Sequence, residues 1–141
     1  MAKIGYIMAT AHYDKLEEDR QWMQDYGCVK IVEENDADEK SRPLWKQLML
    51  ALERGDELVI SKYSNAIRGA RELAMFLEFC RVKVIRVISI HDRIDSNNEL
   101  FPETKPSDVL LMIGSLPDEA LVLRKSSEHV SKLQERMIVQ L

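Results

Sequence analysis

The sequence predicts an α/β fold with a mostly parallel sheet of four to five strands and helices on both faces. Short runs rich in β-branched residues recur at residues 4–9, 29–33, 57–61 and 82–90. Segments with the apolar spacing of helices lie between these runs, and this alternation is typical of parallel sheets. The chain has 141 residues, enough to bury a hydrophobic core without disulfide bonds.

Glycine positions set the ends of the first two predicted helices. The first helix is expected over residues 14–26, because Gly27 can adopt the left-handed conformation that ends a helix. The second is expected over residues 43–54, with a proline in its first turn. Ser41 is its expected N-terminal cap, and Gly55 follows its last residue.

The second half of the chain is predicted to end in a long helix. A third helix is expected over residues 71–80, and the polar loop after the fourth strand offers a short edge strand near residues 100–101. Apolar residues keep a helical spacing over residues 107–141, with a kink or break at Pro117. The sequence therefore predicts an α/β domain over residues 1–106 and a helical arm. The arm either packs on its own sheet or forms a dimer seam.

Composition limits the classes of function. Apolar residues make up 45% of the chain and charged residues 31%, as in globular proteins of the cytoplasm, and no apolar run has membrane-spanning length. The formal net charge of −4 means that DNA binding would need local basic positions or a separate basic region. No His or Cys group has ligand spacing, so no metal site is expected. We expect the acidic run at residues 33–39 to be a solvated loop, and His91 to be a surface or loop histidine.

The first predicted strand leads directly to Thr10. In open α/β sheets, chemistry is carried out just beyond the carboxyl ends of the strands. A hydroxyl at this place is a candidate nucleophile. The other interpretation is that Thr10 caps the first helix or binds loop amides, as threonine commonly does.

Several segments follow, in order, the motifs of one protein family. The matching segments are Gly-Tyr-Ile-Met-Ala-Thr-Ala at 5–11, Gly-Cys at 27–28, Arg-Pro-Leu-Trp at 42–45, Gly-Asp-Glu-Leu-Val-Ile at 55–60, Lys-Tyr-Ser-Asn-Ala-Ile-Arg at 62–68 and Ile-Asp-Ser at 94–96. The family motifs are G-Y-x-R-V-S-T, Gly-Cys, R-P-x-L or R-x-x-L, G-D-x-L-V-V, K-L-D-R-L-x-R and I-D-T. On these segments the chain resembles the N-terminal catalytic domain of the resolvase/invertase family of serine recombinases.

The resemblance implies a resolvase-like three-layer fold followed by a long oligomerisation helix. It also implies attack of a serine hydroxyl on a DNA phosphodiester without metal or energy cofactor, followed by strand exchange. Without a metal, guanidinium groups must meet the charge that grows on the phosphoryl oxygens. Thr10 stands at the position of the nucleophile, and Arg42 and Arg68 match two phosphate-contacting arginines. The remaining basic positions expected to bind DNA or phosphate are Lys62, Arg71, Arg124 and Lys125.

Several family residues are replaced in this chain. Met8 and Asn65 stand where the family has arginines, and Ser64 where it has an acid. Glu33 or Glu34 retains an acidic position after the second strand, and Asp14 and Asp19 stand near the places of two glutamines. Loss of one preorganised donor commonly costs about 10²–10³ in rate, so cleavage is expected to be impaired.

Two functions follow from the resemblance, and whether the chain is an enzyme stays open. One is a site-specific DNA recombinase domain with impaired cleavage. The other is a catalytically inactive homologue that serves as a DNA-binding, assembly or regulatory partner. Either would act as a homodimer, or as a tetramer on DNA, through a DNA-binding region that is missing or separate. An unrelated flavodoxin-like module is disfavoured because no glycine-rich phosphate loop follows the first strand.

Overall fold

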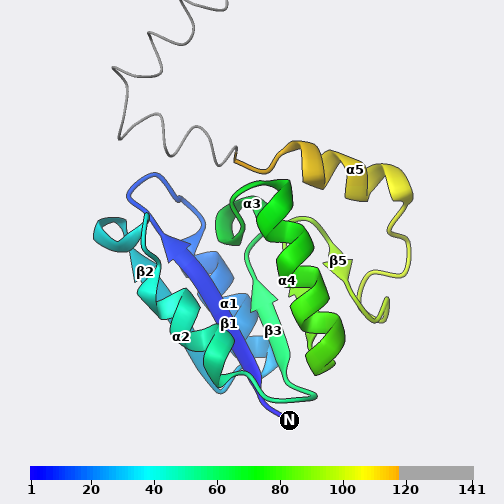
Figure 1. Cartoon of the computed structure of the whole chain (residues 1–141), viewed down its shortest axis with the longest axis horizontal. Helices are drawn as coiled ribbons and strands as arrows, with labels where there is room; N and C mark the ends of the chain where they lie inside the picture. The colour runs from blue at the N-terminus through cyan, green and yellow to red at the C-terminus, as the bar shows by residue number, and fades with distance from the viewer. Residues whose placement is uncertain (118–141) are drawn as a thin grey trace, which may run out of the picture.

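A five-stranded sheet in the order β2-β1-β3-β4-β5 forms the centre of the protein. The computed structural model describes residues 1–117 (Figure 1). Four strands are parallel, and the fifth is antiparallel to its neighbour. The strands are β1 (Lys3–Ala9), β2 (Lys30–Asn35), β3 (Glu57–Ile60), β4 (Arg86–Ser89) and β5 (Ile94–Asp95). The predicted α/β class and mostly parallel sheet are confirmed.

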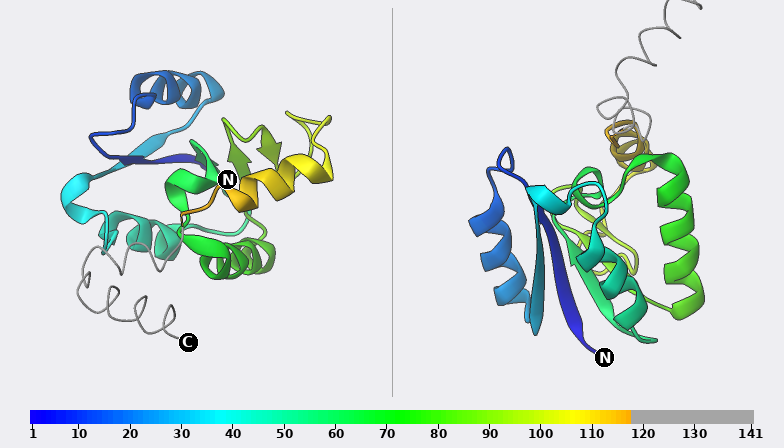
Figure 2. Two further views of the ribbon diagram at one scale, coloured as in Figure 1. Left: turned by 90° about the horizontal axis from the view of Figure 1, so that it is seen from above. Right: turned by 60° about the vertical axis from the view of Figure 1, so that its left-hand side comes forward.

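Helices cover both faces of this sheet (Figure 2). The helix α1 (Leu16–Tyr26) lies on one face, and α2 (Pro43–Ala51) and α4 (Gly69–Lys83) lie on the other. The short helix α3 (Tyr63–Ala66) follows β3 at the carboxyl edge of the parallel strands, and α5 (Pro106–Gly114) crosses the same edge. This edge therefore gathers the loops after β1 and β3, where the sequence places its candidate residues.

Alternation along β1 supplies the two halves of the core. Tyr6 and Met8 belong to the larger apolar cluster, beneath α2 and α4, whereas Ile7 packs with Met23 of α1 in the smaller one. Gly5 faces the sulfur of Met23 so closely that a Cβ atom there would clash with it. Glycine at this position lets α1 lie tightly against the sheet.

The first two helices have N-cap residues that differ from those considered in the sequence. α1 begins at Leu16 rather than residue 14, and Lys15, not Thr10, is its N-cap residue, so the capping interpretation of Thr10 is wrong. Gly27 ends α1 in the left-handed conformation, as predicted. α2 has Arg42, not Ser41, at its N-cap position.

Two strand predictions were wrong because tertiary packing overrides local β propensity. Residues 82–83 belong to α4, and β4 begins only at Arg86. The Lys83 ammonium donates to the Leu52 carbonyl (2.8 Å), which holds the end of α4 against the residue that follows α2. The edge strand is β5 at Ile94–Asp95, while Phe101 packs on the cluster beneath α1.

Most of the predicted terminal helix falls outside the described residues. α5 ends at Gly114, before Pro117. Residues 118–141, including Arg124 and Lys125, lie outside the described residues. The predicted helical arm over these residues therefore stays a prediction.

Candidate active site

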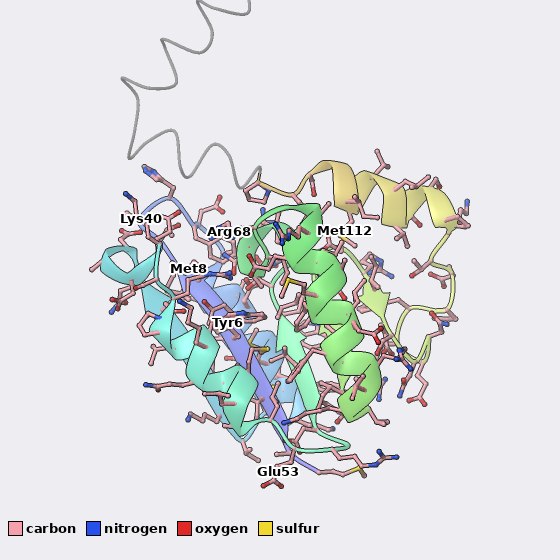
Figure 3. All side chains as sticks on the ribbon, in the orientation of Figure 1. Tyr6, Met8, Lys40, Glu53, Arg68 and Met112 are labelled. Carbon is pink, nitrogen blue, oxygen red and sulfur yellow. The ribbon has the colours of Figure 1, made fainter. Side chains whose placement is uncertain are left out.

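The candidate residues surround the carboxyl edge of the sheet, beside the end of β1 (Figure 3). Met8 and Arg68 lie at this end of the molecule, and Glu53 lies at the opposite end. Thr10 directly follows β1 and is half-buried. Its carbonyl accepts a hydrogen bond from the Tyr13 amide (3.0 Å), which closes a turn over residues 10–13. Beside it, the Ala11 amide donates to the Asp36 carboxylate (2.9 and 3.0 Å).

Asn65 is bound to the backbone of β1. Its Oδ1 accepts from the Met8 amide (2.9 Å), and its Nδ2 donates to the Met8 carbonyl (3.0 Å). Both residues are buried. The two positions at which the resemblance expects arginines thus form a neutral, internally paired contact and supply no charge to a phosphate.

Arg42 is buried, and its side chain forms an ion pair with a carboxylate inside the fold. It adopts a left-handed conformation with φ of 44°, and its side chain crosses from α2 to α4. The guanidinium donates to the Ala66 carbonyl and forms an ion pair with Glu72. It also lies 5.5 Å from the centre of the Trp45 ring. The positive charge of Arg42 is therefore already paired with a carboxylate inside the fold.

Arg68 lies next to Arg42, and within residues 1–117 its side chain pairs with no carboxylate. Its Nη1 donates to the carbonyls of Ser64 (3.2 Å) and Asn65 (2.8 Å), and its amide donates to the second oxygen of Glu72 (3.2 Å). Burial lowers the pKa of Arg68, and the nearby charge of Arg42 lowers it further. Within residues 1–117, its Nε and Nη2 groups make no hydrogen bond. This free edge of the guanidinium suits an anionic oxygen.

The structure also places a buried carboxylate under the start of α2. Glu34 is fully buried and accepts hydrogen bonds from the Tyr6 hydroxyl (2.6 Å) and from the amides of Leu44 (2.7 Å) and Trp45 (3.2 Å). It caps α2 from β2, which explains why Ser41 is not needed. Burial and this carboxylate raise the pKa of Tyr6 well above its usual range. The prediction of a solvated acidic run was wrong at Glu34, because an amide-binding role depends on tertiary proximity.

The other basic candidates are more dispersed. The Lys62 ammonium lies 5.9 Å from the centre of the Tyr13 ring, so it is close to the turn that carries Thr10. Arg71 is exposed on α4 and lines a surface cavity of about 410 Å³ together with Trp45 and Glu72. The structure brings Arg42 and Arg68 together, and among the described residues no hydrogen bond joins the Thr10 hydroxyl to either of them.

A polar network on the α1 face was missed by sequence reasoning. The Asp19 carboxylate is fully buried, accepts a hydrogen bond from the Tyr13 hydroxyl, and lies 2.6 Å from His91 Nε2. Burial and this bond raise the pKa of Tyr13. His91 lies in the loop after β4, as expected, and there it is bound to a buried carboxylate. Because 72 positions separate it from Asp19, no local pattern signals the pair.

Residues 1–117 contain no group of three or more His, Cys, Asp or Glu side chains arranged to hold a metal ion. Over the same residues, no helix is long and apolar enough to cross a bilayer.

Several known proteins are similar to this chain in sequence or in fold. Two curated proteins named DNA-invertase, from Escherichia phage P1 and Enterobacteria phage P7, are 30% and 29% identical over 98 residues. Each match covers 69% of this chain and 53% of the relative, so the chain spans about half the length of these relatives. A crystal structure of a resolvase family site-specific recombinase from Streptococcus pneumoniae shares the fold. It has a TM-score of 0.54 and 17% identity, and the match covers 99% of this chain and 97% of that one.

A family model described as "Resolvase, N terminal domain" matches residues 4–113. The matched segment includes nearly all of β1, all the later strands, and α1 to α4. It also contains Thr10, Arg42 and Arg68 at the edge described above. The chain belongs to the resolvase family and carries its N-terminal domain.

Proposed function

We propose that this chain is the resolvase-type domain of a DNA site-specific recombinase whose strand cleavage is impaired. The proposed site comprises Thr10 as nucleophile and Arg68 as the phosphate-binding cation, with Lys62 beside the turn. Arg42 is assigned to the same site by family position, but it acts there with its charge offset by Glu72. The domain would reach DNA as a homodimer, or as a tetramer, with the help of a separate DNA-binding region.

The proposal that cleavage is impaired rests on one observation. The guanidinium of Arg42 is bound to Glu72 and to the Ala66 carbonyl. In a metal-free phosphoryl transfer, charge on the transferring group must be met by free cationic donors. Here the Met8 and Asn65 positions hold neutral side chains, and the guanidinium of Arg42 is already paired with Glu72. Among the described residues, the Arg68 side chain pairs with no carboxylate, and its Nε and Nη2 stay free for a phosphate. The site therefore supports phosphate binding better than it supports fast cleavage.

The Met8–Asn65 contact favours a second candidate function. A polar side chain that donates to and accepts from the β1 backbone contributes to the fold rather than to catalysis. If cleavage has been lost altogether, the chain would act as a non-catalytic partner that assembles with an active recombinase on DNA. This function needs the scaffold and no nucleophile.

A covalent-trapping experiment separates the two functions. The full-length protein is incubated with supercoiled DNA that carries the repeats of its own locus, quenched with detergent and run on a denaturing gel. The proposal predicts a slowly formed protein–DNA adduct that disappears in Thr10→Ala and forms faster in Thr10→Ser. An adduct that persists in Thr10→Ala would overturn Thr10 as nucleophile. No adduct from wild type or Thr10→Ser, with DNA binding intact, would establish the non-catalytic function.

A further inference from the structure

The turn that carries Thr10 is attached to the sheet by one buried network. Tyr13 closes the turn through its amide, and its hydroxyl donates to Asp19 in the first turns of α1. Asp19 in turn binds His91, whose backbone amide donates to the Ser61 carbonyl (2.9 Å). Three separate segments, the turn, α1 and the ends of β3 and β4, are therefore joined at a single carboxylate.

The burial of the Asp19 carboxylate makes its hydrogen bonds to Tyr13 and His91 important for stability. A fully buried carboxylate is costly unless donors satisfy it, and here both of its oxygens have a partner. His91 has about a fifth of its side chain exposed, so the network lies just beneath the surface. The fully buried Ser61 hydroxyl lies beside Tyr13 and has no hydrogen-bond partner within residues 1–117. Asp19 and Ser61 therefore both lie beside the Tyr13 hydroxyl.

We propose that Tyr13, Asp19 and His91 are positioning residues that fix the turn bearing Thr10 against the ends of β3 and β4. This inference rests on the proposed function, because it assigns these residues to the placement of its nucleophile. The other attachment of the turn, from the Ala11 amide to Asp36, is exposed and is weaker in water. Tyr13 is thus the principal anchor of the turn on the side of α1.

The chemical reason is the narrow tolerance of an attacking oxygen. A misplacement of about 1 Å can cost about 10²-fold in rate, so the turn must be held more tightly than its single backbone hydrogen bond allows. The network does not touch the phosphate. Its members act through the position of Thr10 and should change the rate of attack more than the affinity for DNA.

The first test measures the turn itself, without DNA. Amide exchange with water is followed by NMR in the full-length protein and in Tyr13→Phe, with Tyr26→Phe as control. Tyr26 sits at the other end of α1 and also donates its hydroxyl to a carboxylate, that of Glu57 (3.0 Å). We expect Tyr13→Phe to speed exchange of the Tyr13 amide by about tenfold or more while the Asp19 amide within α1 is unchanged. Tyr26→Phe should leave the Tyr13 amide unaltered.

Two exchange results would overturn the inference. One is an exchange rate of the backbone amide at position 13 that is the same in Tyr13→Phe as in wild type. The other is an equal rise along the whole of α1, which would show a general stabilising role. Because this measurement needs no cleavage, its outcome does not depend on whether the proposed function is correct.

The second test uses conservative rescue in the Thr10→Ser background. His91→Gln keeps an N–H donor for Asp19, whereas His91→Leu removes it. We expect His91→Leu to slow adduct formation by about tenfold or more at unchanged DNA affinity, and His91→Gln to restore most of the rate. Equal loss in both variants, or a loss of DNA affinity alone, would contradict a positioning role. If Thr10→Ser forms no adduct, the proposed function fails and the exchange measurement still decides the inference.

Discussion

Asn65 binds both backbone groups of Met8 at a point where β3 has already ended. The pairing of β1 with β3 stops at Tyr6 and Ile60, two residues before Met8. The amide of Asn65, carried by α3, then continues the hydrogen bonding that a longer β3 would provide. A side chain thus completes the sheet at the edge where the candidate site lies.

Asn65→Ala should destabilise the protein by about 2–4 kcal/mol. The substitution leaves the buried N–H and C=O of Met8 without partners, and each such group costs about 1–3 kcal/mol. Unfolding in urea measures the change. Ser64→Ala is the matched control on the same helix, and we expect it to change stability by less than about 0.5 kcal/mol. Equal, small effects of both substitutions would refute a structural role for the Asn65 amide.

Restoring the family arginine at position 8 should be costly. Met8 is 1% exposed and packs in the main apolar cluster, so Met8→Arg buries a charge and should destabilise the fold by about 3 kcal/mol or more. Thr10→Ser, at the half-buried end of the same strand, should change stability by no more than about 0.5 kcal/mol. Thermal unfolding compares the two variants. Wild-type stability in Met8→Arg would show that an arginine reaches solvent from this position.

Acid should weaken the protein through Asp95. Although burial raises the pKa of Asp95, hydrogen bonds from Arg86 (2.9 and 2.7 Å) and from the Leu100 and Asn97 amides lower it well below its usual range. The unfolded chain, with a carboxyl pKa of about 3.9, therefore takes up a proton first as the pH falls. The contribution is present above about pH 4 and is lost toward the folded-state pKa.

Asp95→Asn tests this pH dependence. At pH 7 the variant should be less stable by about 3 kcal/mol, because Arg86 loses the buried partner that binds it at two atoms. Its free energy of unfolding should also fall less between pH 5 and about pH 3 than that of wild type. Unfolding in urea at a series of pH values gives both quantities. Parallel pH profiles would mean that Asp95 does not carry the acid sensitivity.

The fold could be predicted from the sequence because its signals are local and agree with one another. Apolar periodicity identified the four parallel strands and the principal helices, and Gly27 correctly ended α1. The errors occurred where distant packing overrides local preference. Val82 is β-branched, yet α4 extends past it to Lys83. Glu34 belongs to an acidic run, yet it is buried as the cap of α2.

The candidate site could be predicted only as a set of positions. Family motifs brought Thr10, Arg42 and Arg68 to one edge of the sheet, but they did not reveal what each side chain binds. Glu72 lies four residues after Arg68, a spacing that signals a contact within one helix, yet its main partner is Arg42, 30 residues away. Partners of this kind depend on tertiary geometry, so the neutralisation of Arg42 is visible only in the structure.

Phosphate binding by Glu72→Gln tests most directly whether Glu72 withholds the charge of Arg42 from a bound phosphate. Inorganic phosphate is titrated into the full-length wild type, Glu72→Gln and Glu78→Gln, and NMR shifts near Arg68 report the affinity. Glu78 is the control because it pairs with Arg81 on the exposed surface of the same helix. Thermal unfolding confirms that each variant is folded.

We predict that Glu72→Gln binds phosphate about tenfold more tightly than wild type, a gain of about 1.4 kcal/mol, because it releases the charge of Arg42. Glu78→Gln should bind like wild type. Two results would contradict this: wild type binding phosphate as tightly as Glu72→Gln, or an equal gain in phosphate affinity in both variants. Either would show that Glu72 does not reduce the charge that Arg42 offers to a phosphate.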